Sequence, residues 1–231
     1  MTGTTFWVGP LFRRTPYDPI RDFAPIALLV NSPNVLVVNP GISVKSVKEL
    51  IKLARARPGE LNYATASTGS SSHLASELFK SMAAINVVRI PYKGTGPGLI
   101  DLIAGRVHFS FATSSGVEQH IRAGRLRAIA VTSSAPSVLF TGLPSVSATV
   151  PGYESGGGTA MLAPPRTPAA IIQRLNRESV AALAKPQVKE LFLKRGAEVV
   201  GGSPSQFAAM MRSEIARIDK VIRESGIQTE R

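Results

Sequence analysis

A run of small hydroxyl residues precedes a predicted helix in the first half of the sequence. Residues 61–64 have the apolar pattern of a short strand, and the small residues that follow include Ser67, Thr68, Gly69, Ser70 and Ser71. This hydroxyl loop (residues 67–71) stands directly before the predicted helix. A helix N-terminus offers free N–H groups and partial positive charge, which favour an anion. One serine suffices to cap a helix, so the run favours a carboxylate site, with an ordinary cap and polar turn as the alternative.

Two further loops have the same position between a predicted strand and a predicted helix. In an open α/β sheet such loops meet at the carboxyl edge, where ligands bind. The second loop lacks the Gly-Lys-Ser/Thr order of a Walker loop and the third glycine of a dinucleotide fingerprint. A plain turn is the alternative for each loop, but three consecutive small polar loops favour one shared site. They contribute the candidate residues Lys93, Gly94, Thr95, Thr113 and Ser114.

The three histidines form no catalytic or metal-binding pattern. His73, His108 and His120 lack metal-ligand spacing with one another or with carboxylates, and the chain has no cysteine. His73 adjoins serines, but neighbouring positions on a helix do not face each other as nucleophile and base. The sequence therefore predicts no metal, no cofactor and no catalysis, and His108, on a predicted strand, is interpreted as structural. An enzyme acting on an acyl substrate is the alternative.

Strand and helix patterns alternate along most of the chain. Repeated βα units predict an α/β fold with mostly parallel sheets flanked by helices. Capping boxes at residues 46–49 and 203–206 mark two helix starts. The latter helix is expected to end at Gly226. Strands are expected over residues 27–30, 35–38, 61–64, 87–90, 107–111, 126–131, 160–163 and 197–200. Other helices are expected over residues 71–84, 97–104, 116–123 and 186–194, and from Thr167-Pro168 onward.

Composition narrows the function classes. The 231 residues carry a net charge of +12, but the lysines and arginines are scattered and no basic run is interleaved with aromatics. This pattern argues against nucleic-acid binding and favours long-range attraction of small anions. No stretch reaches the roughly 20 apolar residues of a membrane span. The first residues lack the pattern of a signal peptide, so a cytoplasmic location is expected if the chain is complete as given.

The sequence resembles the Bug-type extracytoplasmic solute receptors, the substrate-binding components of tripartite tricarboxylate transporters. The resemblance covers nearly the whole chain in order. The matching runs include Tyr17-Asp18-Pro19, Val37-Val38-Asn39-Pro40, Leu61-Asn62-Tyr63-Ala64 through His73-Leu74, Pro91-Tyr92-Lys93-Gly94, Leu126-Arg127-Ala128-Ile129, Leu143-Pro144-Ser145-Val146, Pro151-Gly152-Tyr153-Glu154 and Gly201-Gly202-Ser203-Pro204.

The resemblance implies a periplasmic-binding-protein-like fold of two lobes that close on a dicarboxylate, tricarboxylate or acidic amino acid. Lobe 1 is expected to combine residues 1–35 and 156–231, and lobe 2 to cover residues 36–155. Recognition is expected through backbone amides, hydroxyls and waters rather than an arginine clamp. Gly3 and Thr4 are expected near a strand end of lobe 1 that faces the ligand. Membrane transporter subunits are the implied partners, and the periplasm is the implied location.

The chain also departs from the family pattern. Family members open with a leader and a Pro/Gly-rich loop that nothing here matches, so the chain is expected to begin partway through lobe 1. Uncovered sheet edges in an incomplete lobe favour homo-oligomerisation. The alternative function is therefore a truncated remnant that associates with itself or with a partner.

Overall fold

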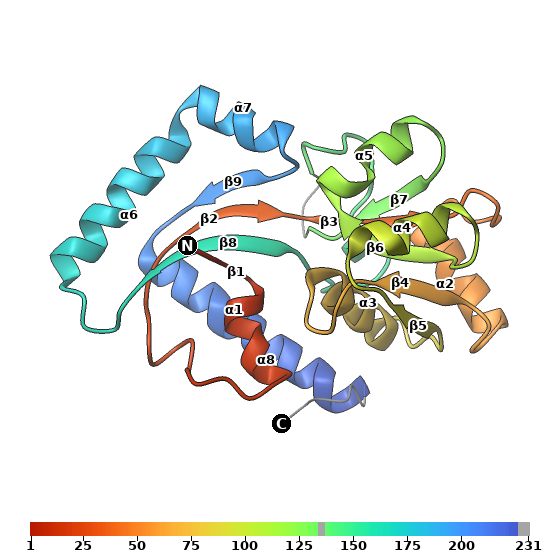
Figure 1. Cartoon of the computed structure of the whole chain (residues 1–231), viewed down its shortest axis with the longest axis horizontal. Coiled ribbons are helices and arrows are strands. Elements are labelled where there is room, and N and C mark those ends of the chain that lie inside the picture. The colour runs from red at the N-terminus through yellow and green to blue at the C-terminus, as the bar shows by residue number, and fades with distance from the viewer. Residues whose placement is uncertain (134–136, 226–231) are drawn as a thin grey trace. The chain divides into compact units, whose positions relative to one another are not determined.

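The computed structural model describes residues 1–133 and 137–225, and the chain forms two compact units (Figure 1). Unit 1 combines Met1–Ser32 with the chain from Gly157 onward, and unit 2 comprises Pro33–Gly156. The chain leaves unit 1 through strand β2 (Ala24–Ser32) and re-enters it through strand β8 (Gly157–Ala163). Within the described ranges, no helix has both the length and the apolar character needed to cross a bilayer.

Unit 1 is built on a four-stranded sheet in the order β1-β8-β2-β9, with β1 at Thr2–Gly3 and β9 at Glu198–Gly201. The α/β class is confirmed, but the expectation of mostly parallel strands is wrong for this unit. All three neighbouring pairs are antiparallel. The reason is the connectivity, because β2 carries the chain out of the unit and β8 brings it back in the opposite direction.

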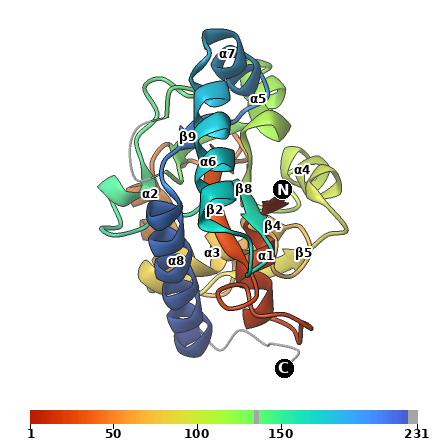
Figure 2. The ribbon, with the colours of Figure 1, turned by 90° about the vertical axis from the view of Figure 1, so that its left-hand side faces the viewer.

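Helices cover the unit 1 sheet. Helices α6 (Ala169–Ala184) and α7 (Pro186–Lys194) pack onto the strands through a cluster that includes Ile26, Leu183 and Phe192. Figure 2 shows α6 running along β2, and Figure 1 shows α8 (Pro204–Ser225) on the other side of the strands. The short helices α1 (Thr5–Val8) and η1 (Gly9–Leu11) precede β2. Trp7 of α1 joins α8, since its indole N–H donates to Glu214 at 2.8 Å.

Unit 2 is built on a five-stranded sheet in the order β5-β4-β6-β3-β7. Strands β4 (Asn62–Thr65), β5 (Val88–Pro91) and β6 (Phe109–Thr113) are parallel. Strand β3 (Asn34–Val38) is antiparallel to both β6 and β7 (Arg127–Val131). The parallel arrangement therefore holds for the three strands that lead into the candidate loops, and their carboxyl ends lie at one edge.

The alternation of side chains along these strands separates two apolar layers. Phe111 of β6 packs against Phe79 of α3 (Ser71–Met82), with ring centroids 5.5 Å apart. The next residue along β6, Ala112, faces the other layer, where Leu99 and Val117 pack. Those two side chains come from α4 (Thr95–Ile103) and α5 (Ser114–Arg122). Period-two alternation thus fixes α3 on one face and α4 and α5 on the other.

Both predicted N-cap serines are present, but only the capping box at 203–206 is complete. The Ser203 N–H donates to the Gln206 side chain at 2.8 Å, whereas Glu49 accepts from the Lys45 N–H at 2.6 Å. The Ser46 hydroxyl accepts from the Glu49 N–H at 3.2 Å at the start of α2 (Val47–Ala56). The Ser203 hydroxyl accepts from the Gln206 N–H at 3.2 Å before α8, while the end expected at Gly226 lies outside the described residues. Helices α4 and α5 each begin two residues earlier than predicted. Pro97 is compatible with this start because first-turn N–H groups make no helical bond.

Candidate functional site

Three helix starts gather at the carboxyl edge of the parallel strands in unit 2. A hollow of about 10 Å³ opens there, and it takes lining residues from strands β4 and β6 and from the starts of α3 and α4. Roughly 10–15 Å³ of such space holds one water molecule, so the hollow admits a single small group such as one carboxylate oxygen. The hollow is lined by Ala64, Thr65, Ala66, Ser72, Gly94, Thr95, Gly98, Ser110 and Phe111.

The hydroxyl loop is held by its own hydrogen bonds at the start of α3. Ser70 is the N-cap, and its hydroxyl accepts from the His73 N–H at 3.3 Å. The Ser72 hydroxyl accepts from the Ala66 N–H at 3.0 Å. Gly69 has a φ of +78°, and its N–H donates to Nδ1 of His73 at 3.1 Å. The Gly69 N–H is therefore used within the loop and is not available to a ligand.

Other N–H groups at these helix starts remain available. Within the described part of the chain, the N–H groups of Ser71 and Ser72 donate to no protein acceptor. Helix α4 begins after Gly94 and α5 after Thr113, and neither receives a side-chain cap. Free N–H groups at a helix start require water or a ligand to accept from them. Ser72 of α3 and Gly94 and Thr95 at the start of α4 line the hollow, so an anion there would lie beside the starts of these two helices.

The second and third predicted loops also lie close together. A methyl group built on Gly116 would be 3.0 Å from the Thr113 hydroxyl oxygen and 3.8 Å from the Thr95 methyl carbon. The buried Ser114 hydroxyl donates to the Pro33 carbonyl oxygen at 2.8 Å. That bond uses the only hydroxyl proton of Ser114, so its side chain has no proton to offer a carboxylate. Lys93 is exposed and makes no ion pair among the described residues.

Gly3 and Thr4 belong to unit 1, whereas the other ten predicted site residues belong to unit 2. The Gly158 N–H donates to the Thr4 hydroxyl oxygen at 2.6 Å, and Gly3 pairs with Thr159 in the sheet. The Thr4 hydroxyl therefore joins β1 to β8. Contact of Gly3 and Thr4 with a ligand stays a sequence-based prediction.

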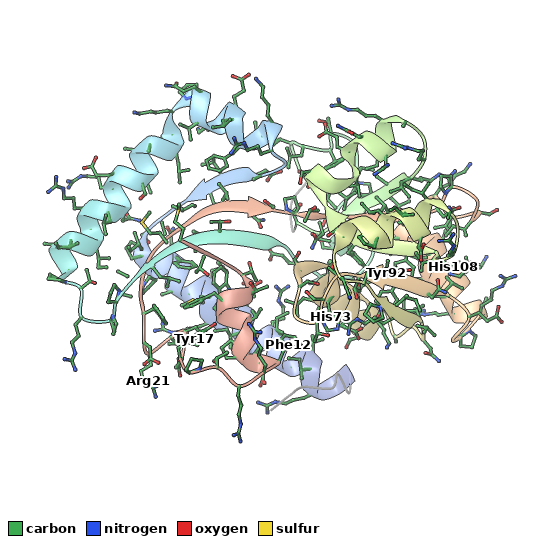
Figure 3. All side chains as sticks on the ribbon, in the orientation of Figure 1. Phe12, Tyr17, Arg21, His73, Tyr92 and His108 are labelled. Carbon is green, nitrogen blue, oxygen red and sulfur yellow. The ribbon has the colours of Figure 1, made fainter. Side chains whose placement is uncertain are left out.

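Buried polar groups lie beneath the hydroxyl loop. Burial lowers the pKa of His73 to about 4, and the positive charge of Arg89 acts in the same direction. The imidazole is therefore neutral at pH 7, which suits Nδ1 as the acceptor of the Gly69 N–H (Figure 3). Burial and a hydrogen bond to Glu77 raise the pKa of Tyr63. Its hydroxyl stays protonated and donates to the buried Glu77 carboxylate.

Sequence reasoning missed Arg89, Thr65 and Ser72. Arg89 lies on β5, where its Nε donates to the Thr65 hydroxyl oxygen at 2.9 Å and a terminal nitrogen donates to the Thr68 hydroxyl oxygen at 3.2 Å. The signal in the sequence is a single arginine within an otherwise apolar strand. It could have been noticed, but the distance to the hydroxyl loop depends on the β4–β5 register.

The arrangement does not support a serine nucleophile. In a serine hydrolase the base accepts the hydroxyl proton of the serine. Here Nδ1 of His73 accepts from the Gly69 N–H, and the Ser70 hydroxyl contacts the backbone N–H of His73 and the Ser72 hydroxyl rather than the imidazole. His108 has the structural role that was predicted, since its Nδ1 accepts from the Asn62 N–H at 3.0 Å. Among the described residues, no cluster of three or more His, Asp or Glu side chains could hold a metal.

A larger hollow in unit 2 is less suited to an anion. It measures about 500 Å³ and is lined mainly by apolar residues, including Ile121, Phe140 and Leu143. Its arginine, Arg127, donates to the carbonyl oxygens of Ile42 and Val44. The hollow also lies by the C-terminal end of α5, where the partial negative charge disfavours anions.

Unit 2 is thus a βα sheet with an anion-compatible hollow at its carboxyl edge. The chain belongs to the tripartite tricarboxylate transporter receptor family, which it matches over residues 1–227. The family consists of solute-binding receptors rather than enzymes, as the sequence analysis expects. The resemblance to Bug-type receptors is therefore confirmed.

Two relatives illustrate the membership. Protein BugT of Bordetella pertussis (strain Tohama I) is 37% identical over 212 residues, which are 91% of this chain and 65% of BugT. A UPF0065 protein from the tcbD-tcbE intergenic region of Pseudomonas sp. (strain P51) is 36% identical over 215 residues, which are 92% of this chain and 64% of that protein. The chain thus spans slightly less than two thirds of the length of each relative.

Solved structures confirm the periplasmic-binding-protein-like fold. R. palustris Rpa4515 with adipate is 36% identical at a TM-score of 0.83, with 98% of this chain and 77% of that chain covered. MatC from Rhodopseudomonas palustris with bound malate is 27% identical at a TM-score of 0.75, with 95% and 75% covered. Periplasmic binding protein BugD is 27% identical at a TM-score of 0.79, with 98% and 77% covered.

Proposed function

We propose that this chain is the ligand-capturing part of a non-catalytic receptor for small carboxylates, with dicarboxylates as the main class. An oxygen of one carboxylate group enters the hollow at the starts of α3 and α4. The remainder of the ligand extends out of it. Tricarboxylates and acidic amino acids share the same carboxylate chemistry and belong to the same proposal.

The observation that carries the proposal is the set of unpaired donors around the hollow. The Ser71 and Ser72 N–H groups have no acceptor among the described residues, and the start of α4 has no side-chain cap. A carboxylate offers only acceptors at neutral pH, so it matches a site made of donors. The relatives solved with adipate and with malate support the same ligand class.

The proposal includes a place of action and a partner. A receptor of this family delivers its solute to the membrane subunits of a tripartite tricarboxylate-type transporter or sensor, and the periplasm is where we propose that capture takes place. The family description and the relation to periplasmic binding protein BugD support this part.

Calorimetric titration tests the proposal. Adipate and malate are titrated into the purified chain, with the neutral diamide of adipate as the control ligand. We expect saturable binding of at least one dicarboxylate and no binding of the diamide. Thr95→Val, which removes a hydroxyl from the hollow, should weaken binding about tenfold. Thr149→Val, at an exposed position after η2 (Val146–Ala148), should leave it unchanged. No binding of any small carboxylate would contradict the proposal.

Self-association is a second candidate function, favoured by a separate observation in unit 1. Helices α6 and α7 expose the apolar side chains of Ile171, Leu175 and Leu191, and Val200 is exposed on β9, at one edge of the sheet. Exposed apolar side chains beside an unpaired strand edge favour association between chains. Sedimentation velocity over a range of concentrations distinguishes a monomer from an oligomer.

A further inference from the structure

Arg89 donates hydrogen bonds to the hydroxyls of Thr65 and Thr68, and Thr65 lines the hollow. Residues Tyr63 and Arg89 are register partners in the parallel β4–β5 pair, so their side chains lie on the same face of the sheet. Thr65, two residues after Tyr63, is on that face as well. The guanidinium therefore reaches Thr65 at 2.9 Å and Thr68 at 3.2 Å.

A hydroxyl group has one proton to donate and two acceptor positions, whereas a guanidinium can only donate. Arg89 occupies an acceptor position on each threonine oxygen. Neither threonine hydroxyl donates to a protein acceptor within the part of the chain that the structure describes. Their protons therefore remain available, and Thr65 lines the hollow.

The charge of Arg89 is held in a partly buried position. Burial lowers the pKa of its guanidinium, and the neighbouring Tyr63 and Glu77 act in the opposite direction. Arginine nevertheless remains protonated in proteins. A positive charge of reduced solvent exposure attracts an anion more strongly than one in water. The remaining N–H groups of Arg89 have no protein acceptor among the described residues.

We infer that Arg89 is a positioning residue for ligand selection: it takes one acceptor position on each of the Thr65 and Thr68 hydroxyls and leaves their protons for the ligand, and this favours an ionised carboxylate over an amide. The inference rests on the proposed function. An amide group would bring N–H donors toward a cation and toward hydroxyls on which one of the two acceptor positions is already taken. A carboxylate brings only acceptors, so the two ligand groups are distinguished even though they have nearly the same shape.

The test compares adipate with its monoamide in calorimetric titrations of four proteins. These are the wild type, Arg89→Met, Arg89→Lys and the control Arg125→Met, which removes an exposed arginine at the far end of α5. Arg89→Met should weaken adipate binding about tenfold to a hundredfold and reduce the preference for adipate over the monoamide. Arg89→Lys should restore part of the affinity but little of the preference, because one ammonium cannot reproduce the two-point geometry.

A double-mutant cycle with Thr68→Val separates positioning from simple attraction. If Arg89 acts through the threonines, Arg89→Met should cost less affinity in the Thr68→Val background than in the wild type. Equal costs in both backgrounds, or an unchanged preference in Arg89→Met, would overturn the inference while leaving the proposed function intact. Failure of the wild type to bind any carboxylate would overturn the proposed function and this inference together.

Discussion

Gly69 shows how a single residue shapes the hydroxyl loop. Its φ of +78° lies in the left-handed region, where side chains with a Cβ atom are strained by roughly 1–2 kcal/mol. Its N–H fixes the orientation of the His73 ring. Gly69 is one of the five residues of the loop that the sequence predicts as a carboxylate site. The structure gives it a second role, which is to form the turn that presents the Ser71 and Ser72 N–H groups.

Gly69→Val tests this role. The variant should lose about 1–2 kcal/mol of stability from backbone strain and should bind adipate at least tenfold more weakly, because the loop rearranges. Gly124→Val is the matched control. Gly124 has a φ of +67° and no other atom within 4 Å of its would-be Cβ, at the end of α5. Gly124→Val should lose a similar amount of stability but should bind adipate as tightly as the wild type. Chemical denaturation and calorimetry give the two quantities, and equal affinities in the two variants would contradict the role.

His73 gives the molecule a pH dependence whose sign follows from its burial. The pKa is about 4 in the folded chain and about 6.5 in the unfolded chain, so the unfolded state binds the proton first as the pH falls. The stability contribution of neutral His73 is therefore complete above pH 6.5 and is lost as the pH falls toward 4. The expected loss is about 3 kcal/mol.

His73→Asn should remove this dependence, because asparagine can still accept from the Gly69 N–H but does not titrate. The measurement is the free energy of unfolding in denaturant at several pH values between 4 and 7. The slope against pH should be clearly shallower in His73→Asn than in the wild type. Equal slopes would mean that His73 is not buried in its neutral form.

At the scale of elements, the close approach of α4 to β4 places Thr95 at the hollow. A Cβ atom on Gly98 would lie 3.1 Å from the Ala64 Cβ and 3.3 Å from the Tyr92 ring. Tyr92 is itself fixed, since its hydroxyl donates to Asp101 of α4 at 2.7 Å. The absence of a side chain at Gly98 therefore sets the distance between helix and strand.

Gly98→Val should force α4 away from β4. Overpacking of this kind costs about 1–3 kcal/mol, and movement of Thr95 should also weaken ligand binding. Gly96→Val, in the same helix, is the control for helix propensity, because a Cβ atom at Gly96 meets nothing within 4 Å. Thermal unfolding should show a lower midpoint for Gly98→Val than for Gly96→Val. The reverse order would contradict the packing argument.

At the scale of the whole molecule, local patterns predicted the elements better than the pairing of strands. The N-cap serines before Val47 and Pro204 and most strand positions were predictable, because they depend on short-range spacing. The antiparallel sheet of unit 1 was not, because its pairing joins β2 to strands more than 120 residues away. Helix α1 (Thr5–Val8) was also missed, because four residues are too few to show the periodic pattern of a helix.

The same distinction applies to the candidate site. Gly94 and Thr95 were predicted and line the hollow, and the hydroxyl loop lies beside it. Predicting the contact between Arg89 and Thr65 would have required the register of the β4–β5 pair. That register brings the two side chains together, but the spacing of residues in the sequence does not reveal it. Ser114 shows the opposite case, because its residue type fits a ligand site while its hydroxyl bonds to the Pro33 carbonyl. Ligand contact by the predicted residues remains a proposal.

A crystal structure of the chain grown with adipate tests the central claim most directly. The proposal predicts one carboxylate of adipate with an oxygen in the hollow, and its oxygens within about 3.2 Å of the Ser71 or Ser72 N–H groups and of the Thr95 hydroxyl. It also predicts that the Arg89 contacts to Thr65 and Thr68 persist in the complex. Adipate bound elsewhere, with the hollow holding only water, would contradict the account.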